Sequence, residues 1–216
     1  MAAPAAAPRR ARRKQARPGE LLEAALALFA EKGYAATRVD AVAARAGVSK
    51  GTLFLYFPSK EALFQAVVHE YATRHLDSGL REVAAYAGPS ADLLREFLRR
   101  WWVHWGSTPA SSLTKLIIGE AANFPDLAAF YQQQVVRPGH ALVRAIVQRG
   151  IARGEFRPVD LDSAVHLVVA PLLHLCTWRH ALAGSAHTSE LPDAPALLAL
   201  HADWVVRALQ PEGAAP

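Results

Sequence analysis

The chain has 216 residues, of which 52% are hydrophobic and 20% charged, a balance typical of a soluble globular protein with a substantial core. Its net charge of +5 is 24 basic minus 19 acidic residues, and residues 1–17 alone carry six basic and no acidic side chains, so residues 18–216 sum to 18 − 19 = −1. The longest apolar run (residues 164–178) is too short for a membrane span, the N-terminus does not fit a signal peptide, and a lone Cys176 excludes an intrachain disulfide, which together predict a cytoplasmic protein.

The basic residues at the start of the chain define the first segment, a predicted disordered arm over residues 1–17. Two interpretations remain open for it. The arm is either a solvated tail or a segment that lies along nucleic-acid phosphates and strengthens binding in a salt-dependent way.

Beyond the arm, apolar residues recur at helical spacing and the alternation typical of β-strands is missing, so we predict an all-α fold with about nine helices. Two domains are expected, a helix-turn-helix domain over residues 18–64 and a second helical domain over residues 65–216.

The first predicted helix, "GELLEAALALFAEKGY", carries one apolar face and ends at Gly33. That face consists of Leu22, Ala25, Leu26 and Phe29. Thr37 follows and is predicted to cap the second helix by accepting a hydrogen bond from the backbone N–H of Asp40.

A turn at Gly47 ends the second helix, and Ser49 is predicted to cap the third. The third helix begins with Lys50, Gly51 and Thr52, a run of small and polar residues that suits contacts with phosphates and base edges. An ordinary corner between two core helices is the alternative, but such a corner has no use for this polar face.

The stretch "TRVDAVAARAGVSKGTLFLYFPSKEALFQAVV" resembles the DNA-binding domain of the TetR family of bacterial repressors, with the match running from about Leu21 to Val68. The resemblance implies that Thr37 and Lys60 touch backbone phosphates, that Ser49 to Thr52 enter the major groove, and that Tyr56 adds a hydroxyl contact. This chain departs from the family at Phe54, where tyrosine is common, and Leu55 beside it is also apolar, so neither is predicted as a contact. The predicted DNA-binding residues are Thr37, Ser49, Lys50, Gly51, Thr52, Tyr56 and Lys60.

A fourth helix is expected from Pro58 to about Val83, and five more follow over residues 90–106, 109–122, 125–153, 160–183 and 193–209. Pro138 is predicted to kink or split its helix, and Pro171 to bend its own more gently.

The resemblance also implies that the second domain is regulatory, dimerises and usually holds an inducer. Wide apolar faces on the helices at 160–183 and 193–209, with Leu197, Leu200, Trp204 and Ala208 in one stripe, suit a four-helix dimer interface. Packing within one chain is the alternative for these faces.

Aromatic residues and histidines in the second domain predict a cavity for a small apolar or aromatic ligand. An ordinary hydrophobic core is the alternative interpretation of the same residues. The predicted ligand-binding residues are Trp101, Trp105, Phe124, Tyr131, His166 and His174.

Neither a catalytic motif, a cofactor nor a metal site is predicted. Cys176 and His180 have metal-ligand spacing but no further ligands nearby, and an apolar helix should raise the pKa of the Cys176 thiol and make it unreactive. The predicted function is a homodimeric repressor that a small ligand releases from a palindromic operator. The alternatives are an activator on the same fold, a non-specific DNA-binding protein, and an enzyme with an appended DNA-binding domain.

Overall fold

A computed structural model of the chain describes residues 18–73, 76, 78–181 and 193–211. The predicted basic arm at residues 1–17 lies outside these residues. The chain divides into a first unit that ends at Val67 and a second that begins at Val68. Helices and turns make up the described residues, which confirms the all-α prediction.

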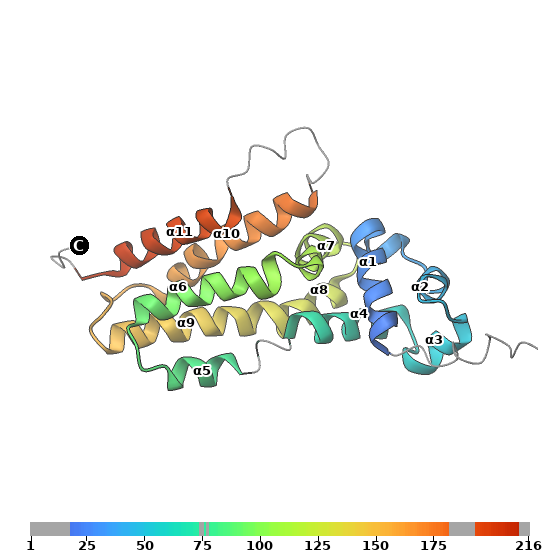
Figure 1. Ribbon diagram of the computed structural model, residues 1–216, viewed down its shortest axis with the longest axis horizontal. Helices are drawn as coiled ribbons and strands as arrows, with labels where there is room; N and C mark the ends of the chain where they lie inside the picture. The colour runs from blue at the N-terminus through green and yellow to red at the C-terminus, as the bar shows by residue number, and fades with distance from the viewer. Residues whose placement is uncertain (1–17, 74–75, 77, 182–192, 212–216) are drawn as a thin grey trace, which may run out of the picture. The chain divides into compact units, whose positions relative to one another are not determined.

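The first unit packs its helices around a small aromatic and aliphatic core (Figure 1). The rings of Phe29, Tyr34 and Phe64 contact one another with centroids 5.6 to 5.7 Å apart. The predicted face of the first helix is buried, as are Val42 and Leu53 from the next two. The helices of this unit are α1 (Pro18–Ala36), α2 (Val39–Arg45), α3 (Lys50–Tyr56) and the start of α4 (Lys60–Val68).

Two glycines set the turns between these helices. Gly33 has φ 80° and ψ 171°, so the backbone leaves the helical conformation there. Helix α1 is therefore kinked at Gly33 before it ends at Ala36. Gly47 has φ 72° in the turn between α2 and α3. Both values lie in the region that side chains with a Cβ avoid, and this confirms the predicted turn glycines.

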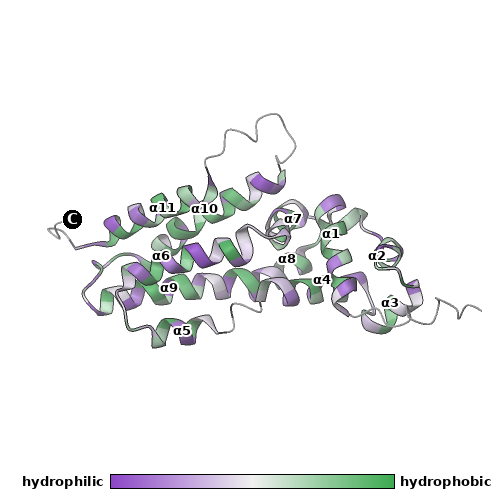
Figure 2. Ribbon diagram, in the orientation of Figure 1, coloured by the Kyte–Doolittle hydropathy of each residue, from purple (hydrophilic) through white to green (hydrophobic). Residues whose placement is uncertain are grey.

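The second unit is a helical bundle in which α6, α9, α10 and α11 run alongside one another (Figure 1). Its core contains side chains from all four, including Leu94, Ile146, Leu172 and Val206. Figure 2 shows apolar residues recurring along most of α10 and α11. The elements of this unit are η2 (His69–Thr73), α5 (Gly79–Ala85), α6 (Ser90–Trp101), η3 (Trp102–Gly106), η4 (Pro109–Ser111), α7 (Ser112–Glu120), α8 (Pro125–Tyr131), η5 (Gln132–Val136), α9 (Arg137–Ala152), α10 (Leu161–Ala181) and α11 (Ala194–Leu209).

The single helix predicted from residue 58 to about 83 is wrong. Helix α4 ends at Val68, the π-helical turn η2 follows, and α5 starts separately at Gly79. The side chain of Ser78 donates to Glu82 at 2.6 Å, which favours a helix start at this point. Gly79 lies so close to α9 that an added Cβ would come within 2.6 Å of Leu142, so a glycine permits the close approach.

The helix expected over residues 125–153 runs as α8, the π-helical turn η5 and α9, with helical dihedral angles at each junction and Pro138 in the first turn of α9. Pro171 lies inside α10, and this helix continues across the proline as a single element. By length and composition alone α10 could cross a membrane, a test that core helices of soluble proteins also pass.

Candidate nucleic-acid interface

Helix α3 is attached to its unit by one buried side chain. Of its seven residues, Leu53 is buried and the others are partly or largely exposed. The helix begins at the predicted cap, because Ser49 Oγ accepts a hydrogen bond from the backbone N–H of Thr52 at 3.0 Å. Successive residues of an α-helix are rotated by about 100°, so Gly51 and Leu55 lie on the side opposite Leu53. This side is the outward face of α3.

Five of the predicted DNA-binding residues come together on or beside α3. Lys50, Gly51 and Tyr56 are exposed, and the hydroxyls of Ser49 and Thr52 lie 2.9 Å apart in a hydrogen bond. Nothing but the Ser49 hydroxyl, at 3.8 Å, lies within 4 Å of where a Cβ on Gly51 would stand. The backbone of α3 is therefore open to close approach by another molecule.

Lys60 stands at the start of α4 and is held against the end of α1. Its Nζ donates to the carbonyl of Ala35 at 3.0 Å and lies 4.4 Å from the ring centroid of Tyr34. These contacts hold the Lys60 charge beside the end of α1.

Thr37 does not present its hydroxyl to a partner molecule. The residue is 2% exposed, and its Oγ1 donates to the carbonyls of Gly33 at 2.7 Å and Leu28 at 3.1 Å. The predicted cap is also wrong, since α2 begins after Arg38 with no side-chain cap. Thr37 instead joins the end of α1 to the start of α2, and a phosphate contact by its side chain does not fit this placement.

Sequence reasoning missed one exposed cation near α3. Arg38 forms an ion pair with Asp40 at 3.0 Å, and its side chain is largely exposed. The hydrogen bond from Arg38 holds the pKa of the Asp40 carboxyl below its usual value, and the charge of Lys50 adds to this effect. Asp40 therefore stays ionised at neutral pH and pairs with Arg38. In the sequence, the spacing of two residues between Arg38 and Asp40 is the pattern that could have indicated this ion pair.

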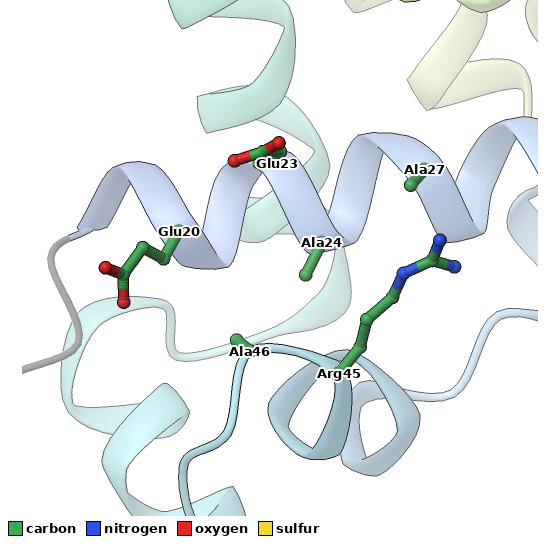
Figure 3. Close-up of a pocket in the computed structure, with 6 residues that line it drawn as sticks. All are labelled: Glu20, Glu23, Ala24, Ala27, Arg45 and Ala46. Atoms are coloured by element: carbon green, nitrogen blue, oxygen red, sulfur yellow. The ribbon is translucent and has the colours of Figure 1, made fainter. Parts of the chain in front are cut away.

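A hollow of about 370 Å³ lies on the first unit between α1 and the end of α2 (Figure 3). Glu20 and Glu23 line it from α1, and Arg45 reaches toward α1 from α2. The Arg45 guanidinium is already bound to both carboxylate oxygens of Glu31, at 2.7 and 2.8 Å. The lining is polar and contains none of the residues predicted to bind a ligand.

Those predicted ligand residues are divided between the interior and the surface of the second unit. Tyr131 is buried, with its hydroxyl 3.2 Å from Thr114 Oγ1, and burial raises its pKa far above the usual value. His166 and His174 are exposed on α10, so they do not join an interior cavity with the aromatic residues. The ring of His166 packs on His140 of α9 instead, with centroids 5.2 Å apart. Partly exposed are Trp101, Trp105 and Phe124.

A small polar cluster lies inside the second unit where α7 meets α10. Ser111 Oγ is 2.7 Å from Nε2 of His180, and burial lowers the pKa of that histidine. Burial raises the pKa of the Cys176 thiol to about 11, the direction predicted from its apolar helix. Within the part of the chain that the structure describes, no three His, Cys, Asp or Glu side chains are grouped so as to hold a metal.

The second unit leaves a large apolar surface uncovered on α10 and α11. Leu167 and Leu173 of α10 and Leu200 and Trp204 of α11 are exposed, Trp204 to 63%. We call these four residues the apolar face. Leu197, Leu200, Trp204 and Ala208, predicted as one stripe, are all partly or fully exposed.

Two family profiles match the chain in succession. "Bacterial regulatory proteins, tetR family" matches residues 21–67, which hold the whole of α2 and α3. "Tetracyclin repressor-like, C-terminal domain" matches residues 87–194, half of the chain.

Individual relatives and solved structures agree with these profiles. The chain is 26% identical over 160 residues to the HTH-type transcriptional regulator YdeS of Bacillus subtilis, covering 71% of this chain and 75% of that protein. It is 39% identical over 93 residues to RutR of Escherichia coli, covering 42% of each. A TetR-family regulator structure from Mesorhizobium loti superposes with TM-score 0.66 at 26% identity, covering 94% of this chain and 96% of that one. FadR from Bacillus halodurans gives TM-score 0.70 at 20% identity, with coverages of 88% and 94%.

The matching proteins are transcriptional regulators and not enzymes, and their DNA-binding profile covers the helices that carry the outward face of α3. The chain therefore belongs to the TetR family of bacterial DNA-binding transcriptional regulators.

Proposed function

We propose that this regulator is a homodimeric repressor that binds a palindromic operator and leaves it when a small apolar or aromatic ligand binds. The outward face of α3 carries the proposal, because it presents Lys50, Gly51 and Thr52 on a helix with one buried residue. Two such helices must stand about 34–36 Å apart to enter successive major grooves on one side of a duplex. The proposed contacts are Ser49, Lys50, Gly51, Thr52, Tyr56 and Lys60.

The apolar face supports the dimer. The four exposed side chains lie on two helices that contact each other, and α10 and α11 of two chains would bury them as a four-helix interface. A partner copy also accounts for the apolar character of α10 without a membrane. The proposed location is the bacterial cytoplasm.

Release by a ligand is supported by the aromatic side chains of the second unit and by the fold. The structure of FadR from Bacillus subtilis, which has TM-score 0.64 and 18% identity to this chain, was solved in complex with stearoyl-CoA, so a domain of this fold can hold a ligand. In this chain Trp101, Trp105, Phe124 and Tyr131 are the proposed contacts. A ligand that prefers the dimer with wrongly spaced α3 helices lowers operator affinity through a coupling of about 1–3 kcal/mol.

Two substitutions test the DNA contacts. Thr52→Val removes a hydroxyl and keeps the shape of the side chain, whereas Lys60→Ala removes a charge. Each should weaken binding to an operator selected from a random duplex pool, measured by fluorescence anisotropy, by roughly 5- to 100-fold. Lys115→Ala, which alters an exposed lysine of the second unit, is the matched control and should bind like the parent. Parental affinity in both test variants would show that these contacts are wrongly assigned.

Two further measurements separate the alternatives. A repressor should prefer its operator to a scrambled duplex by about a thousandfold or more, whereas a non-specific DNA-binding protein binds both alike. Deleting the protein should raise expression of a reporter placed behind the operator, and a fall would identify an activator. Mass spectrometry of the purified protein tests for a retained ligand.

A further inference from the structure

The most exposed large apolar side chain on α3 has no role in the contacts described so far. Leu55 is 85% exposed although it lies one residue from Phe54 and Tyr56, which are exposed to 39% and 42%. An isobutyl group held in water on a seven-residue helix adds nothing to the folding of its unit. We infer that Leu55 is a specificity-determining residue that reads the methyl group of a thymine in the operator.

The position of Leu55 on the helix is the first argument. Leu55 lies two residues after the buried Leu53, so its side chain leaves α3 on the outward face. One turn earlier on the same face is Gly51, which has no side chain and open space around it. Nothing on α3 therefore keeps a base pair from reaching Leu55.

The chemistry of the groove is the second argument. Leu55 has neither a donor nor an acceptor, so it cannot bind a phosphate or read a base edge by hydrogen bonding. Among the groups that base pairs present in the major groove, the C5-methyl of thymine is the apolar one. Contact between the two removes both from water, which corresponds to a roughly fourfold gain in affinity for each methyl group.

The neighbouring ring points to Leu55 rather than to Phe54. Lys50 Nζ lies 5.8 Å from the ring centroid of Phe54, one turn away on the same flank of α3. Phe54 thus packs against a cation that is itself a proposed DNA contact, which makes it a positioning residue. Leu55, which is 85% exposed, stays available to a base.

The inference rests on the proposed entry of α3 into the major groove, and its test removes one methyl group at a time. An operator is first selected from a random duplex pool with the full chain. Each thymine is then replaced by uracil, which lacks only the C5-methyl. At one symmetric pair of thymines, the affinity of the parent protein should fall roughly fourfold for each methyl group removed. Leu55→Ala should bind the thymine and uracil duplexes equally.

Control variants keep the result interpretable. Leu55→Met retains an apolar side chain and should keep the preference for thymine, and Leu80→Ala alters an exposed leucine of α5 and should behave as the parent. Leu55→Ala should melt at the parental temperature, since the side chain is exposed. An operator without thymine under α3, or an equal loss on uracil in parent and Leu55→Ala, overturns the inference alone. A pool in which no sequence is enriched overturns the proposed function as well.

Discussion

Phe54 shows how one missing hydroxyl changes what α3 offers to DNA. Its ring is 39% exposed and packs beside Lys50, and a tyrosine at this position would extend the same ring by a hydroxyl group. Such a group contacts phosphates in many DNA-binding proteins but carries no sequence information. This chain therefore relies less on phosphate contacts at this position and more on its other side chains.

Phe54→Tyr should accordingly raise affinity for every duplex. One added hydrogen bond of about 0.5–1.5 kcal/mol corresponds to roughly 2- to 12-fold, and operator and scrambled duplex should gain equally. Anisotropy titrations on both duplexes measure this, with Phe57→Tyr as a control on a half-buried neighbouring ring. A gain confined to the operator would mean that the hydroxyl reads a base.

At the same scale, the sequence predicted Ser49 as a cap correctly and Thr37 wrongly. Both residues precede a helix, and a threonine three residues before an aspartate fits the capping pattern. The hydroxyl of Thr37 is instead taken by carbonyls of Gly33 and Leu28, the latter nine residues away. Local spacing contains no information on such a contact, because it depends on how α1 ends.

Among the elements, the turn between α2 and α3 depends on backbone conformation alone. Gly47 has φ 72°, and nothing lies within 4 Å of where its Cβ would stand. Gly47→Ala should therefore destabilise the first unit by about 1–2 kcal/mol through strain and not through a clash. Chemical denaturation measures the loss. Gly19→Ala, at an equally open position of α1 with an ordinary φ, should cause no loss of stability. Equal losses of stability in the two variants would contradict the role given to the φ of Gly47.

The contacts that α10 makes with η4 and α9 should make the second unit sensitive to acid. Burial lowers the pKa values of both His180 and His140, so the folded chain favours their neutral forms. Their contribution to stability is fully present above the ordinary histidine pKa of about 6.5 and is lost as the pH falls below it. The free energy of unfolding should thus decrease between about pH 7 and pH 5.

Tryptophan fluorescence during guanidinium denaturation, repeated across this pH range, measures that decrease. His140→Asn combined with His180→Asn should flatten the dependence, because asparagine does not titrate. If the double variant retains the full slope, other groups are responsible.

Helix boundaries in the second unit illustrate what pattern alone can and cannot predict. The helices predicted over residues 90–106 and 193–209 start where the structure starts α6 and α11, after Pro89 and close to Asp193, although residues 102–106 form the π-helical turn η3. Apolar spacing continued smoothly past Val68, which hid the break before α5. That break depends on close packing of Gly79 against Leu142, a contact between residues far apart in the sequence.

For the whole molecule, the decisive quantity is the stability of the proposed dimer. Trp204→Glu places a charge on the apolar face and should weaken self-association by roughly 30-fold or more, the effect of losing an interface anchor of about 2 kcal/mol. Operator affinity should fall with it, because one chain presents one α3. Sedimentation velocity measures self-association, and fluorescence anisotropy measures operator affinity. Leu80→Glu, on α5, is the control. A Trp204→Glu chain that still sediments as a dimer would show that the interface lies elsewhere.

The single buried anchor of α3 has an evolutionary consequence. Because Leu53 is the buried residue of this helix, its exposed positions carry few packing constraints and can mutate with little effect on the fold. Operator preference can then change codon by codon while the second unit is inherited unchanged. Gene duplication followed by a few replacements on α3 would give two regulators that share a second unit and differ in their target sequences.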